Sequence, residues 1–197
     1  MPEKFIRDQN NKIIDKKTLI EQGHYVVKKI ELEKQLARIN NEIDFIINML
    51  DGKVAVVTGG TRGIGFATVK KFLENEAKVI LLGSRKESVD KAISELKSIN
   101  ENYEVEGAWP NLEDLSSVKK TFAEINEKYG KIDILVNNAG MSAMDKIYDY
   151  KEEDFKKIIN LNVNAVFNCS RAVVEYMKEN GGGVILNTSS MVSIYGQ

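Results

Sequence analysis

The sequence predicts an α/β protein: a doubly wound parallel sheet of about five readable strands, preceded by a helical extension. Two observations support this fold class. From residue 53 onward, short apolar runs alternate with helix-length amphipathic stretches, whereas residues 1–50 show no such alternation. Alternating strands and helices build parallel sheets with helices on both faces, and right-handed crossovers produce the doubly wound order. We therefore divide the chain into an N-terminal helical extension over 1–51 and an α/β domain over 52–197.

The apolar runs and the stretches between them define the individual elements. Strands are predicted at 54–57, 79–82, 134–136 and 184–186, with a weaker candidate at 103–108. Helices are predicted at about 63–76, 87–98, 114–129 and 152–179. Each strand except the last is followed by a helix long enough to form the crossover that a parallel pair requires.

A different pattern precedes this domain. Apolar residues recur at steps of four and three, at Leu32, Leu36, Ile39, Ile43, Ile46 and Leu50. This seam predicts a long helix, but it is shorter than the ~3–4 heptads typical of a coiled coil. Gly52 can end the helix in the left-handed conformation. Upstream, residues 5–15 hold two apolar pairs around a polar centre and are consistent with either a small hairpin or an irregular arm.

The charge balance and the cysteine count limit the partners and the compartment. Lys and Arg total 28 against 29 Asp and Glu, so no basic surplus favours nucleic acid or an anionic membrane. No apolar run approaches the ~20 residues that cross a bilayer. A single cysteine, Cys169, excludes an internal disulfide and, with a charged N-terminus, favours the cytoplasm. Neither Cys169 nor His24 has ligand spacing around it, so no metal site is predicted.

A glycine-rich loop follows the first predicted strand and opens the helix after it. It reads Thr58-Gly59-Gly60-Thr61-Arg62-Gly63-Ile64-Gly65. In such a loop Gly59 allows a tight turn, Gly63 lets the backbone approach a pyrophosphate, and Gly65 permits close packing of helix on strand. The helix N-terminus adds free N–H groups and partial positive charge. Strand, loop and helix in this order predict a dinucleotide site, although glycines also serve ordinary turns.

Three further motifs follow the loop. They are Asn137-Asn138-Ala139-Gly140, Asn162-Val163-Asn164-Ala165-Val166-Phe167 and Asn187-Thr188-Ser189-Ser190. With the loop spacing G-x-x-x-G-x-G, they make residues 53–197 resemble the short-chain dehydrogenase/reductase family. The resemblance implies a Rossmann fold, an NAD(P)(H)-dependent oxidoreductase that transfers hydride to or from a small carbonyl or alcohol substrate, and a homo-oligomer. It also implies that the domain over 52–197 is incomplete at its C-terminal end, and it does not cover residues 1–50.

The resemblance also implies which residues bind the cofactor. In the glycine loop they are Gly59, Thr61, Arg62, Gly63, Ile64 and Gly65. After the fourth strand they are Asn138, Ala139 and Gly140, with turn formation as the alternative role for the asparagine. Asn111, followed by Leu112, stands where the family has an aspartate beside the adenine. An asparagine can donate and accept there, and loop capping is its alternative role.

The residues after the second strand bear on the choice of cofactor. An acid there bonds the ribose 2′-hydroxyl of NAD, whereas a basic residue accommodates the 2′-phosphate of NADP. The chain has Ser84 and Arg85 and no carboxylate at this place, and Arg62 can reach the same region. NADP is therefore favoured, with NAD as the second choice. The alternative is that Arg85 and Lys86 are a solvated charge pair opening the next helix.

Four family residues carry the chemistry: an asparagine, a serine, a tyrosine and a lysine. Asn162 and Ser190 match the first two. The tyrosine would lie about a dozen residues beyond Ser190, past Gln197, and a general acid/base must reach its substrate. We therefore expect little or no reductase activity from this polypeptide alone. Two other interpretations stay open: a non-catalytic nucleotide-binding homologue, and a helix-mediated interaction or scaffold protein that uses the 32–50 seam.

Overall fold

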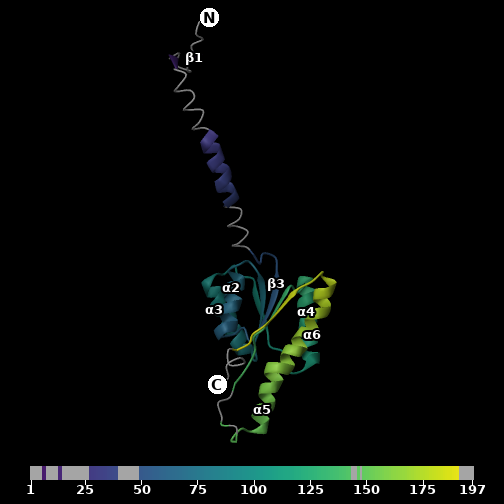
Figure 1. Cartoon of the computed structure of the whole chain (residues 1–197). Helices are drawn as coiled ribbons and strands as arrows, with labels where there is room; N and C mark the ends of the chain where they lie inside the picture. The colour runs from purple at the N-terminus through teal and green to yellow at the C-terminus, as the bar shows by residue number, and fades with distance from the viewer. Residues whose placement is uncertain are drawn as a thin grey trace. The chain divides into compact units, whose positions relative to one another are not determined.

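The structure, a computed structural model, describes residues 6–7, 13–14, 27–39, 49–142, 146 and 148–190. The chain separates into two compact units, Met1–Asn48 and Met49–Gln197. Figure 1 shows the elements that make up each unit. All four sequence motifs described above belong to the second unit.

A five-stranded parallel sheet forms the centre of the second unit (Figure 1). Its strands are β3 (Val54–Thr58), β4 (Lys78–Leu82), β5 (Val105–Ala108), β6 (Ile134–Asn137) and β7 (Val184–Asn187). They lie in the order β5-β4-β3-β6-β7, and every neighbouring pair is parallel. The predicted doubly wound parallel sheet is confirmed, and the weaker strand candidate is β5.

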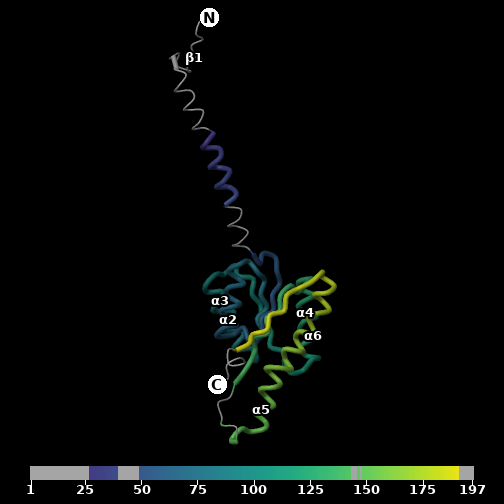
Figure 2. The backbone as a smooth tube through the Cα atoms, in the orientation of Figure 1, coloured from purple at the N-terminus to yellow at the C-terminus, as the bar shows by residue number. Residues whose placement is uncertain are grey.

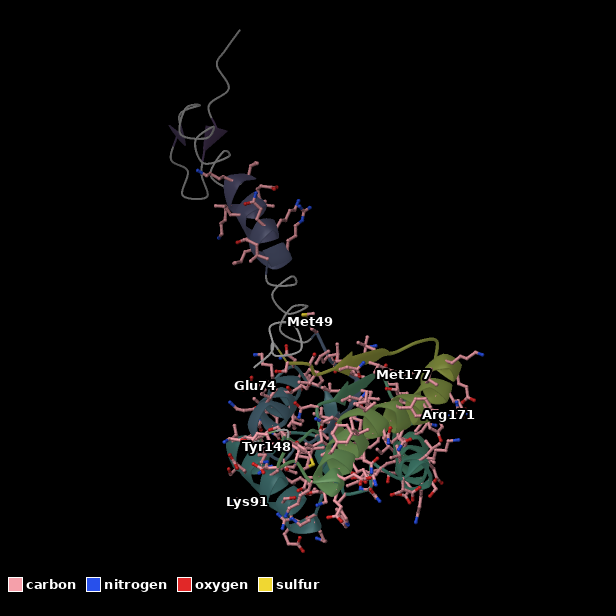
Figure 3. All side chains as sticks on the ribbon, turned by 60° about the horizontal axis from the view of Figure 1, so that its bottom comes forward. Met49, Glu74, Lys91, Tyr148, Arg171 and Met177 are labelled. Carbon is pink, nitrogen blue, oxygen red and sulfur yellow. The ribbon has the colours of Figure 1, made fainter. Side chains whose placement is uncertain are left out.

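Helices cover both faces of this sheet. They are α2 (Gly63–Leu73), α3 (Lys86–Ile99), α4 (Leu115–Tyr129) and α6 (Ala165–Glu179). The first two lie on one face and the last two on the other, as the tube in Figure 2 shows. The side chains divide in the same way: Glu74 and Lys91 belong to the α2–α3 side, and Arg171 and Met177 to the α6 side (Figure 3). Crossovers on opposite faces give the sheet its double winding.

Alternation along the central strand supplies one hydrophobic core to each face. Val54 and Val56 of β3 join the core beneath α4 and α6, while Ala55 and Val57 join the core beneath α2 and α3. All residues of β3 are buried because helices cover both sides. Each large apolar side chain buried in this way contributes roughly 1.5–3 kcal/mol. Continuous apolar runs are therefore the sequence signal of the inner strands.

The predicted helix over 152–179 is three consecutive elements. α5 (Glu152–Ile159) continues into a π-helical turn, η1 (Asn160–Asn164), and then into α6. A π-turn carries one extra residue per turn and is frequent at functional sites. The sequence did not predict this turn because apolar residues continue on both sides of it.

The first unit contains a strand pair, β1 (Ile6–Arg7) and β2 (Ile13–Ile14). The strands are antiparallel, with Ile6 opposite Ile14. Of the two alternatives for residues 5–15, the structure therefore has the hairpin pairing. A helix spans 27–39 in the same unit.

The apolar seam expected over 32–50 is only partly observed. Leu32, Leu36 and Ile39 lie on the helix over 27–39 and are exposed, while residues 43 and 46 are outside the described residues. Leu50 does not continue the seam: it lies in a turn and packs against the core beneath α2 and α3. Gly52 in this turn has a φ of 66°, the left-handed conformation expected for it. No helix in the described part of the chain is long and apolar enough to cross a membrane.

Candidate functional site

The candidate site lies at the carboxyl ends of β3 and β6, the neighbouring strands at which the winding of the sheet reverses. From β3 the chain continues to β4 on one side, and from β6 it continues to β7 on the other. Such a switch point leaves a crevice between loops that diverge to opposite faces. A cavity of about 790 Å³ occupies this place. Its volume lies within the ~300–1,000 Å³ typical of ligand pockets.

The loops after four strands line this cavity. All predicted cofactor-binding residues except Arg85 belong to its lining, namely Gly59, Thr61, Arg62, Gly63, Ile64, Gly65, Ser84, Asn111, Leu112, Asn138, Ala139 and Gly140. Lining residues that were not predicted are Leu82, Gly83, Trp109, Pro110, Glu113, Met141 and Leu161. Most of these end or closely follow a strand. A strand-end position at the switch point is the signal that could have identified them.

The glycine loop depends on three glycines with different constraints. Gly59 and Gly63 have φ angles of 64° and 56°. At Gly65, a Cβ would lie 2.2 Å from the Gly59 carbonyl oxygen, so only glycine lets α2 pack this closely on the loop. At Gly63, a Cβ would meet nothing within 4 Å. The backbone at Gly63 therefore borders open space into which a ligand could approach.

The N-terminus of α2 is suited to an anion. Its N-cap residue, Arg62, makes no side-chain cap, and the first turn holds no acidic residue. Uncapped N–H groups and the helix dipole favour negative charge at this end. Arg62 is exposed and lines the cavity, so its guanidinium adds positive charge there.

Hydrogen bonds from β3 hold the turn after β6 in place. Thr58 is 2% exposed, and its Oγ1 accepts from the backbone N–H groups of Asn138 and Ala139, both at 2.9 Å. The Asn138 side-chain amide donates to the carbonyls of Thr58 and Gly59 at 3.2 and 3.4 Å. Asn138 thus ties the turn after β6 to the start of the glycine loop, and it also lines the cavity.

The ends of β4 and β5 form the opposite wall. The Gly83 N–H donates to the Ala108 carbonyl at 2.9 Å, so the loops after the two strands start side by side. Asn111 Oδ1 accepts from the Glu113 N–H at 3.1 Å, which is the loop-capping role, and Asn111 lines the cavity as well. Arg85 is the N-cap residue of α3, is exposed and lies outside the lining.

The two predicted catalytic residues lie outside the cavity lining. Asn162 Oδ1 accepts from the Met141 N–H at 2.9 Å, and its Nδ2 donates to the Met141 carbonyl at 2.8 Å. Because Met141 lines the cavity, Asn162 fixes part of the cavity wall from η1. Ser190 follows β7 and is exposed. The catalytic roles of both residues stay predictions.

Cys169, which the sequence analysis set aside, lies outside the cavity lining. Cys169 is buried in the core beneath α4 and α6, and this burial raises the pKa of its thiol to about 12, which suits a packing residue. His24 lies outside the described residues. In the part of the chain that the structure describes, no group of three or more His, Cys, Asp or Glu side chains could hold a metal ion.

Known proteins share the region that builds this cavity. A family model described as short chain dehydrogenase matches residues 53–197. The 3alpha-hydroxysteroid dehydrogenase of Mediterraneibacter gnavus is 58% identical over 149 residues, which cover 76% of this chain and 60% of that protein. The NADP-dependent (R)-specific alcohol dehydrogenase of Lentilactobacillus kefiri is 35% identical over 148 residues, which cover 75% of this chain and 58% of that protein.

A solved structure of similar fold is an NAD+-bound xylitol dehydrogenase. It matches with a TM-score of 0.71 and 31% identity, over 75% of this chain and 56% of that one. The chain spans about 60% of the length of the curated relatives that it matches. Because the family model covers most of the sequence and the fold agrees, this chain belongs to the short-chain dehydrogenase/reductase family, whose members use NAD(P) cofactors.

Proposed function

We propose that the unit from residue 53 onward binds NADP(H) and serves an oxidoreductase that transfers hydride between the nicotinamide and a carbonyl or alcohol substrate. The observation that carries this proposal is the cavity at the switch point. Its lining includes the N-terminus of α2, which has no side-chain cap, and residues after β4, none of which is acidic.

The residues present fit a dinucleotide. The open space beside Gly63 and the start of α2 would receive the pyrophosphate, because a Cβ there meets nothing and the first turn has no competing carboxylate. Asn138, Ala139 and Gly140 would lie along the ribose and adenine side of the cofactor. The bound nicotinamide supplies the hydride. The protein orients the cofactor and keeps the wall at Met141 in place through Asn162.

The preference for NADP(H) is supported by the charges near the end of β4. Ser84 and Arg62 are exposed in the cavity wall, and both can donate to a 2′-phosphate. Glu113 is the acid in the described lining, and it comes from the loop after β5. The name of one relative specifies NADP, whereas the similar solved structure holds NAD+.

Titration of the 197-residue polypeptide with NADPH and NADH tests the cofactor preference. We expect NADPH to bind about tenfold or more tightly, since one charge-assisted contact is worth on the order of 1.5 kcal/mol or more. Arg62→Ala should reduce this ratio, and Arg171→Ala, an exposed arginine of α6, should leave it unchanged. Equal affinities, or tighter binding of NADH, would contradict the preference.

The relative at 58% identity is named a 3alpha-hydroxysteroid dehydrogenase. We therefore extend the proposal to a hydroxysteroid or ketosteroid as the first substrate to test for binding to the NADPH-loaded chain, with a simple secondary alcohol as the comparison. Because the matched residues build the nucleotide cavity, a failure with steroids would leave the cofactor proposal intact.

We also propose self-association through α5, η1 and α6. Large apolar side chains recur along these elements and remain exposed, namely Phe155, Ile159, Val163, Phe167 and Val174. An apolar stripe of this length on a soluble surface is typical of an interface. Light scattering of the wild type and of Phe167→Glu would show whether the stripe holds copies together, and a monomeric wild type would contradict the proposal.

A further inference from the structure

Trp109 is a large aromatic side chain that stays 47% exposed in the wall of the cavity. It directly follows β5, and the hydrogen bond between Gly83 and Ala108 brings the start of its loop beside the end of β4. Neither the glycine loop nor the predicted phosphate contacts assign it a role. An indole in a ligand cavity offers a flat apolar surface on which a planar base can stack.

Lys86 brings a positive charge to the same indole. Its Nζ lies 5.6 Å from the centroid of the Trp109 ring and 2.5 Å from Asp90 Oδ2. Lys86 is the first residue of α3, and Ser84, two residues earlier, lines the cavity. The lysine side chain therefore reaches from the start of α3 to the loop after β5, at the edge of the cavity. A solvated charge pair of Arg85 and Lys86, considered from the sequence, would not require this contact.

We propose that Trp109 and Lys86 together recognise the phosphorylated adenosine of the dinucleotide. The indole stacks on the adenine, and Lys86 Nζ binds the 2′-phosphate. This inference rests on the proposed function, because it requires that the cavity bind NADP(H). Neither Lys86 nor Arg85 belongs to the cavity lining, but the Lys86 ammonium lies over the ring of Trp109, which does. Lys86, rather than Arg85, is therefore the cation that joins Arg62 at the phosphate.

The charges around Lys86 suit an exchange of partners. Lys86 and Asp90 are both more than half exposed, so solvent screens the ion pair between them and it contributes little free energy. A phosphate can therefore replace the Asp90 carboxylate without leaving a buried charge unpaired. The ammonium binds phosphate as a compact point charge, which needs no fixed two-pronged geometry. Asp90 then acts as a competitor that lowers the affinity for the 2′-phosphate.

Fluorescence of the intact chain can test the stacking, because Trp109 is its single tryptophan. The probes are ADP-ribose and its 2′-phosphate, which contain the adenosine end and lack the nicotinamide. We expect both probes to quench the Trp109 emission as they bind, and the phosphorylated probe to bind more tightly. Isothermal titration calorimetry gives the same affinities without relying on the fluorophore.

Substitutions test the roles of Lys86 and Trp109 separately. Lys86→Met should lower the affinity for the phosphorylated probe about tenfold and leave the affinity for ADP-ribose unchanged. Asp90→Asn should raise the affinity for the phosphorylated probe. Trp109→Leu, followed by calorimetry, should weaken both probes by a similar factor. The matched control is Lys91→Met, an exposed lysine of the same helix outside the cavity lining, which should alter neither affinity.

Two outcomes distinguish a failure of this inference from a failure of the proposed nucleotide site. If the wild type binds neither probe by calorimetry, the proposed nucleotide site is wrong and the inference falls with it. If the wild type prefers the phosphorylated probe and Lys86→Met keeps that preference, or if saturation leaves the Trp109 emission unchanged, the nucleotide site stands and the inference is overturned.

Discussion

The Thr58 hydroxyl accepts a hydrogen bond from the backbone N–H of Asn138 at 2.9 Å, and the Asn138 side-chain amide donates back to the Thr58 carbonyl at 3.2 Å. The two residues are 80 positions apart in the sequence. They join the end of β3 to the turn after β6, the two loops between which the cavity opens. Thr58 thus fixes the position of the turn after β6 relative to the end of β3.

Replacing Thr58 by valine should destabilise the second unit. Valine has a similar shape but leaves the N–H groups of Asn138 and Ala139 without this acceptor, and each buried unsatisfied group costs about 1–3 kcal/mol. We expect the free energy of unfolding, measured in urea, to fall by about 2 kcal/mol or more. Thr58→Ser keeps the hydroxyl and should lose less. Equal stability of the two variants would show that the hydroxyl is not needed.

Gly63 should be more sensitive to valine than to asparagine. Its φ of 56° is strained for a β-branched side chain, whereas asparagine tolerates this conformation. Both side chains would project into the open space beside the loop. We expect both variants to lose NADPH binding and only Gly63→Val to lower the melting temperature clearly. Circular dichroism accompanies each titration, and undiminished binding by a folded Gly63→Asn would remove this backbone from the site.

Asn162→Ala should loosen the cavity wall at Met141. The variant lacks both hydrogen bonds to the Met141 backbone, so the Met141 amide loses its acceptor. We expect faster hydrogen exchange at Met141 and a loss of about 1 kcal/mol in unfolding free energy. Asn160→Ala is the matched control in the same π-turn, because Asn160 bonds Asn164 instead. Unchanged exchange at Met141 in Asn162→Ala would count against this positioning role.

Asp133 should make the stability of the second unit depend on acid pH. Partial burial opposes its ionisation, but the hydrogen bond from the Val54 N–H and the nearby ammonium groups of Lys131 and Lys53 prevail and hold its pKa below the ordinary 3.8. A lowered pKa in the folded state gives stability that is present above 3.8 and lost as the pH falls through the lower folded value.

Asp133→Asn keeps an oxygen acceptor for Val54 but has no charge, so it isolates this effect. The wild type should be more stable than this variant by about 1 kcal/mol near neutral pH, and the difference should shrink below about pH 4. Urea unfolding at several pH values measures it. A difference that is constant down to about pH 2 would be inconsistent with the lowered pKa.

Glu76→Gly should stabilise the second unit. Glu76 has a φ of 65°, and it ends α2 in a motif in which the Ala77 N–H bonds the Phe72 carbonyl and the Glu76 N–H bonds the Leu73 carbonyl. Glycine is the usual residue at this left-handed position. Relief of strain of about 1–2 kcal/mol, less the entropy that glycine loses on folding, should leave a gain of roughly 0.5–1 kcal/mol. Glu76→Ala, which keeps the strain, should show no such gain in thermal unfolding.

Local sequence determined the strands, the glycine loop and most of the lining. The run from Val54 to Val57 predicts a buried strand because every side chain in it is apolar and the strand is covered on both faces. Gly63 and Gly65 mark the loop because the left-handed backbone at Gly63 disfavours most side chains and the close packing at Gly65 leaves no room for a Cβ. Such constraints act within a few residues, so a single sequence reveals them.

Tertiary structure alone decided which of these residues meet. The contact of Lys86 with Trp109 depends on the pairing of β4 with β5, and the bond from Thr58 to Asn138 depends on the pairing of β3 with β6. The Asn162 side chain, on the π-turn, bonds the backbone of Met141, 21 residues away. No local preference encodes these distances, because strand order and helix crossover set them. Most residues of the site can therefore be predicted from the sequence, whereas the packing of the whole sheet determines which residues they contact.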